Sequence, residues 1–162
     1  FAVQGLGGWP IARAGSAALQ ARWLPGIAAG REVVTFAATE PEAGSDLGAM
    51  TTMARRESDD YVLDGHKVFI SSAPLATVHV VFARTSETGE RSRRLSAFVV
   101  PAAAAGVEVG RMELLTSHDI GQLRLRQVRV PGSHRLGDEG DGLSLCLATL
   151  DVFRPTVGAA AC

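Results

Sequence analysis

The chain has 162 residues, of which 46% are hydrophobic and 20% charged, and its formal net charge is −1. This composition is typical of one globular domain with attachments, and the balanced charge excludes nucleic acid as a leading partner, because phosphate binding depends on a clustered positive excess. No apolar run approaches the roughly 20 residues that a membrane span needs, so we expect no membrane partner either.

The first predicted element is a short amphipathic helix that ends near Gly30. Ser16 is a candidate N-cap, and Leu19, Trp23 and Ile27 follow at positions i, i+4 and i+8. This spacing places the three apolar side chains on one helical face.

From Val33 the pattern changes to short β-type runs that are rich in Val, Phe and Thr. These runs are Val33–Thr39, Thr51–Arg56, Tyr61–Ile70, Val78–Arg84, Leu95–Pro101 and Leu123–Val130. Turn residues separate them and no helical pattern intervenes. The pattern therefore predicts a small antiparallel β-barrel or sandwich rather than a parallel sheet.

Two local signals refine the predicted strands. Asp64-Gly65 predicts a tight hairpin turn inside the third run, because such a turn favours positive φ. In the last run the apolar positions shift between Leu125 and Val128, which predicts a bulge or corner there.

After Gly142 helical spacing returns, with Pro155 expected to bend the helix. The predicted fold class is α+β, with the order helix, β domain, helix.

Cysteine and histidine spacing predicts neither a disulfide framework nor a metal site. Cys146 and Cys162 have no CxxC partner, and the four histidines show no i, i+4 spacing. We expect a reducing, cytoplasmic location, and the many Ala, Arg and Gly residues favour a bacterial source. The chain begins without Met and its last residues run out inside an apolar helical pattern, so we also expect it to be cut at both ends.

The densest motif follows the first predicted strand and reads Thr39-Glu40-Pro41-Glu42-Ala43-Gly44-Ser45-Asp46. Pro41 fixes one φ angle, Gly44 permits close approach of another group, and the residues after it leave hydroxyl and N–H groups facing outward. On these residues alone, the segment either holds a phosphate or a flavin edge or is a plain strand-to-loop turn.

Several motifs in order resemble the acyl-CoA dehydrogenase family. They are Phe36–Asp46, Gly65–Ala73 (GHKVFISSA), Phe82–Thr85, Ala97–Val100, Val128–Pro131 and Leu150–Ala161. The resemblance covers essentially the whole chain. It implies the end of an N-terminal helical domain over residues 1–32, a flavin-facing middle β domain over 33–137, and the truncated first helix of a C-terminal helical domain over 138–162.

The resemblance implies FAD as cofactor, with contacts from Phe36, Thr39, Gly44, Ser45, Phe69, Ile70 and Ser71. A hydroxyl at Ser71 would donate to flavin N5, the atom that receives hydride, and donors at Thr39 would hold the pyrimidine edge. Phe69 departs from the family's usual tryptophan. Its ring can still cover the isoalloxazine but has no indole N–H to donate.

Contacts to an acyl-CoA substrate are implied at Ser45, Ser92, Asp151 and Arg154. On the helix pattern alone, Asp151 and Arg154 also fit an exposed i, i+3 ion pair. Glu40 fits a structural acceptor in the turn better than a catalytic group.

In this family a glutamate removes the α proton of a thioester while the β hydrogen leaves as hydride to the flavin. Some members carry that glutamate immediately before the arginine that corresponds to Arg154, and this chain has Phe153 there. We therefore assign no catalytic base, expect the base beyond Cys162, and expect the isolated chain to be inactive.

The resemblance implies an FAD-dependent acyl-CoA dehydrogenase that forms an α,β double bond. It further implies a homotetramer and an electron-transferring flavoprotein as electron acceptor. Two alternatives stay open: an acyl-CoA oxidase or flavin monooxygenase of the same fold, and a non-catalytic β-barrel binding module.

Overall fold

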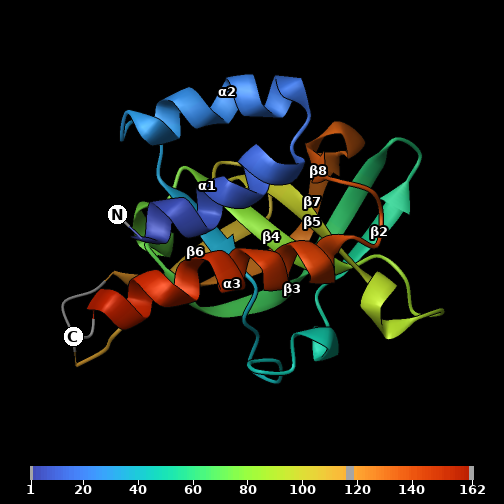
Figure 1. Ribbon diagram of the computed structural model, residues 1–162. Coiled ribbons are helices and arrows are strands. Elements are labelled where there is room, and N and C mark those ends of the chain that lie inside the picture. Colours follow the sequence, from blue (N-terminus) through green and yellow to red (C-terminus); the bar gives the residue numbers. More distant parts are fainter. Residues whose placement is uncertain (1, 116–118, 161–162) are drawn as a thin grey trace.

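The computed structural model describes residues 2–115 and 119–160 (Figure 1). Its helices are α1 (Ala2–Ala14), α2 (Ala17–Ala28) and α3 (Gly142–Ala160). Its strands are β1 (Val34–Ala37), β2 (Met53–Glu57), β3 (Asp60–Ser71), β4 (Val78–Arg84), β5 (Leu95–Pro101), β6 (Val107–Met112), β7 (Ile120–Pro131) and β8 (Arg135–Leu136). The expected α+β fold, with strands between flanking helices, is confirmed. Cys162 lies outside the described residues.

The strands form one sheet in the order β6-β7-β3-β2-β4-β5-β8, with β1 beside β4. Most neighbours are antiparallel, as expected. The exceptions are the parallel pair of β1 with β4 and a single parallel contact between Met53 of β2 and Arg84 of β4. A parallel neighbour requires a crossover connection, and the β2–β3 hairpin lies within the chain that connects β1 to β4.

The predicted hairpin at Asp64-Gly65 is wrong, because β3 continues through both residues. The chain instead turns between β2 and β3, where Ser58 has a φ of 56°. Gly65 allows the Thr52 side chain to pack closely against β3, because a Cβ atom at residue 65 would lie 2.2 Å from Thr52 Oγ1. The bulge predicted between Leu125 and Val128 is confirmed by a register shift in the β3–β7 pair.

The helix predicted after Ser16 is confirmed as α2. The Ser16 side chain accepts a hydrogen bond from Leu19 N at 3.3 Å, which caps the helix. The sequence pattern did not predict α1, whose glycines and proline disfavour an isolated helix. Packing explains it: a Cβ atom at Gly7 would lie 2.8 Å from Val34 Cγ2, so α1 approaches β1 closely.

Helices cover one face of the sheet, and the sheet curls around a second core as an open barrel, whose end strands β6 and β8 do not pair with each other in the described part of the chain (Figure 1). The helix-side cluster joins Ile11 of α1, Trp23 of α2 and Cys146 of α3 to Val80 of β4. The inner cluster contains apolar side chains of β3, β4, β5 and β7, among them Leu63, Val81, Phe98 and Leu123. Because strand residues alternate in direction, β4 contributes to both clusters. Within residues 2–115 and 119–160, no helix is long and apolar enough to cross a membrane.

Candidate functional site

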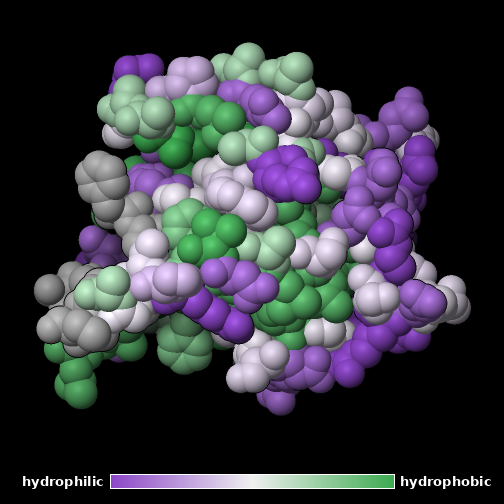
Figure 2. All heavy atoms as spheres, in the orientation of Figure 1, coloured by the Kyte–Doolittle hydropathy of each residue, from purple (hydrophilic) through white to green (hydrophobic). Residues whose placement is uncertain are grey.

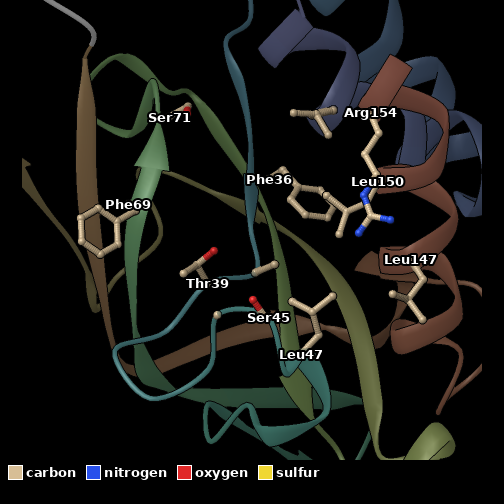
Figure 3. A pocket seen from close by; sticks show the side chains of 12 residues that line it. Phe36, Thr39, Ser45, Leu47, Phe69, Ser71, Leu147, Leu150 and Arg154 are labelled. Carbon is tan, nitrogen blue, oxygen red and sulfur yellow. The ribbon is translucent and has the colours of Figure 1, made fainter. Parts of the chain in front are cut away.

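A cavity of about 350 Å³ lies between the segment after β1, the end of β3, and α3 (Figure 3). Figure 3 shows Phe69 and Ser71 on one side of it, Thr39 and Ser45 on the segment after β1, and side chains of α3 on the opposite side. Its lining residues are Leu6, Phe36, Ala38, Thr39, Gly44, Ser45, Leu47, Phe69, Ser71, Leu147, Leu150 and Arg154.

Six of the seven residues expected to contact FAD line this cavity. The exception is Ile70, whose side chain is 1% exposed and packs inside the barrel. Consecutive strand residues face opposite sides of a sheet, so Phe69 and Ser71 face the cavity while Ile70 faces the core. Of the residues expected to contact the substrate, Ser45 and Arg154 also line the cavity.

Three hydroxyl groups in this cavity are free to bind a ligand. The side chains of Thr39, Ser45 and Ser71 make no hydrogen bond with any described residue. Each hydroxyl carries one donor and two acceptor lone pairs. The cavity therefore combines unpaired polar groups with the aromatic rings of Phe36 and Phe69.

Phe69 is placed by an irregularity in β3. The register of β3 against β7 shifts between Lys67 and Ile70, so Val68 and Phe69 together face a single residue of β7. Phe69 has a φ of 56°, which is rare for a bulky residue, and its side chain is 57% exposed. Bulges commonly redirect side chains near functional sites. Here the bulge turns an aromatic ring out of the core and leaves it exposed at the edge of the cavity.

Glu40 is a buried structural acceptor, as expected from the turn. Its carboxylate accepts hydrogen bonds from Thr51 N at 2.6 Å, Thr51 Oγ1 at 2.8 Å, Thr52 N at 3.0 Å and Lys67 Nζ at 2.8 Å. Burial acts to raise the pKa of Glu40, but the Lys67 ammonium and these hydrogen bonds outweigh it and lower the pKa to about 2. A carboxylate with so low a pKa is a weak base, and donors already occupy both of its oxygens, so Glu40 is a poor proton acceptor at neutral pH.

Sequence reasoning missed Lys67. Its side chain is fully buried and donates to Glu40 Oε1 and, at 3.1 Å, to Ala38 O. The available signal was a lysine in an otherwise apolar stretch of strand, because a lysine is almost never fully buried unless it is paired.

A shallower groove of about 290 Å³ adjoins the cavity and shares Ser45, Leu47 and Leu147 with it. Ser92 lines this groove, so the structure brings Ser45 and Ser92 together. Ser92 is exposed, and its Oγ donates to Glu90 Oε2 at 3.3 Å. Arg91 forms an ion pair with Asp46 across the groove.

The remaining expected residues lie on α3, the helix whose exposed apolar side chains include Leu147 and Val152. Figure 2 shows apolar side chains gathered over the middle of this face of the molecule. Asp151 and Arg154 form the exposed i, i+3 ion pair at 3.4 Å, and Asp151 lines neither the cavity nor the groove.

Phe153 occupies the position before Arg154, and its ring packs against α1. A Cβ atom added at Gly5 would lie 2.5 Å from Phe153 Cε1. Among the described residues that line the cavity there is no carboxylate, imidazole or thiol. The cavity can therefore bind and orient a ligand, but these residues do not supply a proton acceptor.

The chain is similar to known proteins over the segments that form the cavity. Residues 35–128 match the family described as acyl-CoA dehydrogenase, middle domain. Cyclohexane-1-carbonyl-CoA dehydrogenase of Geobacter metallireducens is 38% identical over 162 residues, which covers 98% of this chain and 42% of that protein. A subunit of the caffeyl-CoA reductase-Etf complex of Acetobacterium woodii is 36% identical and covers 92% of this chain and 40% of the subunit.

A solved structure shares the architecture. Glutaryl-CoA dehydrogenase from Mycobacterium smegmatis, in complex with FADH2, has a TM-score of 0.86 and 34% identity, covering 94% of this chain and 39% of that one. The chain thus spans about two fifths of the length of these proteins.

Proposed function

Because the chain belongs to the acyl-CoA dehydrogenase family, we propose that it forms the flavin-facing part of an enzyme that introduces an α,β double bond into an acyl-CoA thioester. One observation carries the proposal: the unpaired hydroxyls of Thr39, Ser45 and Ser71 share a cavity with the exposed ring of Phe69. A flavin needs both hydrogen-bond partners at its polar edge and apolar contact with its ring faces.

The residues present fit FAD. Thr39 and Ser71 supply donors on two sides of the cavity, while Phe36 and Phe69 supply aromatic surface. Space is open at Gly44, where an added Cβ atom would meet nothing within 4 Å. Ile70 contributes through its main chain only, because its side chain is buried in the barrel. A bound flavin would supply hydride acceptance at its N5 atom.

We assign the groove that adjoins the cavity to the acyl-CoA. Ser45 belongs to both hollows and Ser92 lines the groove, so a thioester that spans them would reach both hydroxyls. Arg154 contributes a cation at the far wall of the cavity, and Asp151 acts through its ion pair with Arg154. The apolar side chains of Leu147 and Leu150 lie beside these polar groups.

The proton acceptor in this proposal lies outside the described residues. Glu40 is buried and ion-paired, and Phe153 packs against α1. The 162 residues are therefore expected to bind ligands without turnover. We retain the division into residues 1–32, 33–137 and 138–162 as part of the proposal. An electron-transferring flavoprotein as acceptor is supported by the relative that belongs to a reductase-Etf complex.

The direct test is equilibrium dialysis of FAD against the chain and three variants. Thr39→Val and Ser71→Ala should each raise the dissociation constant about 3- to 10-fold, as expected for the loss of one net hydrogen bond. Ser133→Ala, which lies far from the cavity beside α2, is the matched control and should not change the dissociation constant. Equal affinities in all four proteins would contradict the placement of FAD.

A further inference from the structure

Lys67 and Glu40 form a buried ion pair behind the wall of the cavity, and the proposed reaction does not use it. The distance from Lys67 Nζ to Glu40 Oε1 is 2.8 Å, and the two side chains are 0% and 2% exposed. The ammonium also lies 3.1 Å from Ala38 O and 3.6 Å from Met50 Sδ. Neither Lys67 nor Glu40 lines the cavity.

The pair anchors the cavity segment to β3 at successive positions. Ala38 and Glu40, which flank Thr39, are both bonded to the Lys67 ammonium. Thr39 itself accepts a main-chain hydrogen bond from Val68 at 3.0 Å. Residues 38–40 are therefore tied to residues 67–68. Because Phe69 follows directly on β3, these bonds fix the Thr39 hydroxyl relative to the Phe69 ring.

Glu40 also closes the loop that carries the other lining residues. Its second set of contacts runs to the main-chain N–H groups of Thr51 and Thr52 and to the Thr51 hydroxyl. Residues 41–50, with Gly44 and Ser45 among them, lie between these two tied ends. One carboxylate thus holds both the start and the end of the loop.

We propose that Lys67 and Glu40 are positioning residues of the flavin site, which hold the segment that carries Thr39 and Ser45 against the Phe69 bulge without touching the ligand. This inference rests on the proposed function of the cavity. Net stability does not account for the pair, because the cost of desolvating two buried charges offsets much of their attraction. What the pair does specifically is to hold the segment that carries Thr39 in a fixed position against β3.

The experiment uses a double variant, Lys67→Met with Glu40→Gln. Met fills the volume of the lysine stem, and Gln keeps one side-chain oxygen as acceptor for the Thr51 N–H and hydroxyl, so the end of the loop stays bonded and no lone charge is buried. A single Lys67→Met variant would leave the Glu40 carboxylate buried and unpaired, and could fail to fold.

Two readouts apply. The first is amide hydrogen exchange at Val68, referred to the amide of Val81 in β4, which reports global opening. We expect Val68 in the double variant to lose about tenfold protection relative to Val81. The second is the FAD dissociation constant, expected to rise about tenfold. A Leu63→Ala variant, which changes a buried residue of the same strand, is the stability control. It should change neither the protection of Val68 relative to Val81 nor the FAD dissociation constant.

The outcomes separate the two claims. Failure of the unaltered chain to bind FAD would contradict the proposed function of the cavity. Unchanged Val68 protection in the folded double variant would overturn the positioning role whatever the FAD result. Lost protection with unchanged FAD affinity would also overturn it, because the pair would then be structural only.

Discussion

Thr35 of β1 and His79 of β4 face each other inside the barrel, with 2.8 Å between Thr35 Oγ1 and His79 Nδ1. Both side chains are fully buried, and His79 Nε2 has no partner among the described residues. Burial lowers the pKa of His79 to about 4, because the charged imidazolium would lose its hydration.

The first prediction concerns stability between pH 6.5 and 4. Over this window the unfolded chain takes up a proton at His79 and the folded chain does not, so the free energy of unfolding falls as the pH falls, by on the order of 3 kcal/mol in total. A His79→Asn variant should lack this component. Urea unfolding of both proteins at pH 7 and pH 5 measures it, and the same pH dependence in both would contradict the buried neutral imidazole.

A second pH window belongs to Glu40. Its pKa is lowered to about 2, so its contribution to stability is fully present above pH 4.5 and is lost as the pH falls from 4.5 toward 2. The Lys67→Met, Glu40→Gln double variant should therefore lose less stability than the parent chain between pH 5 and 3. Denaturant unfolding at these two pH values compares them. A parallel decline in both proteins would exclude the assigned pKa.

Gly65 and Gly44 allow a matched pair of alanine substitutions. A Cβ atom at Gly65 would lie 2.2 Å from Thr52 Oγ1 and 2.6 Å from Thr52 Cβ, so Gly65→Ala should destabilise the chain by about 1–3 kcal/mol. Gly44→Ala meets open space and should change the free energy of unfolding by less than about 0.5 kcal/mol. Thermal or urea unfolding tests both, and similar effects at the two sites would contradict the packing around β3.

Phe69 offers a fluorescence test of the cavity. Its side chain is mostly exposed, so Phe69→Trp should change stability by less than about 0.5 kcal/mol. The new indole would lie at the edge of the cavity, and added FAD should quench its emission beyond any quenching of Trp9 and Trp23 in the unaltered chain. Identical quenching curves for the two proteins would argue against a flavin beside residue 69.

Local signals predicted the parts of the fold that neighbouring residues determine. Ser16 caps α2, and the shift of apolar positions after Leu125 marks a real bulge. Asp64-Gly65 misled because the same dipeptide that suits a turn also permits close approach, here to Thr52. The residue pattern did not indicate α1, because contact with β1 stabilises it rather than its own residues; only the family resemblance implied helix there, as part of a helical domain over residues 1–32.

The candidate site was predicted in part. The family resemblance implied that Thr39, Ser45 and Ser71 contact one ligand, and all three line one cavity. It also implied a contact from Ile70, whose side chain faces the core because strand side chains alternate in direction. The Lys67–Glu40 pair depends on a contact between residues 27 positions apart, which periodicity does not reveal. Long-range polar contacts of this kind become visible only in the fold.

The central claim is that the cavity between β3 and α3 binds a flavin. The most direct measurement is an NMR titration of the isotopically labelled chain with FAD, and separately with FMN and AMP. The account predicts that FAD and FMN shift the amide signals of Thr39, Gly44, Ser45, Phe69 and Ser71, while AMP leaves them in place. Flavin-induced shifts that map elsewhere on the chain, or no shifts at millimolar flavin, would contradict it.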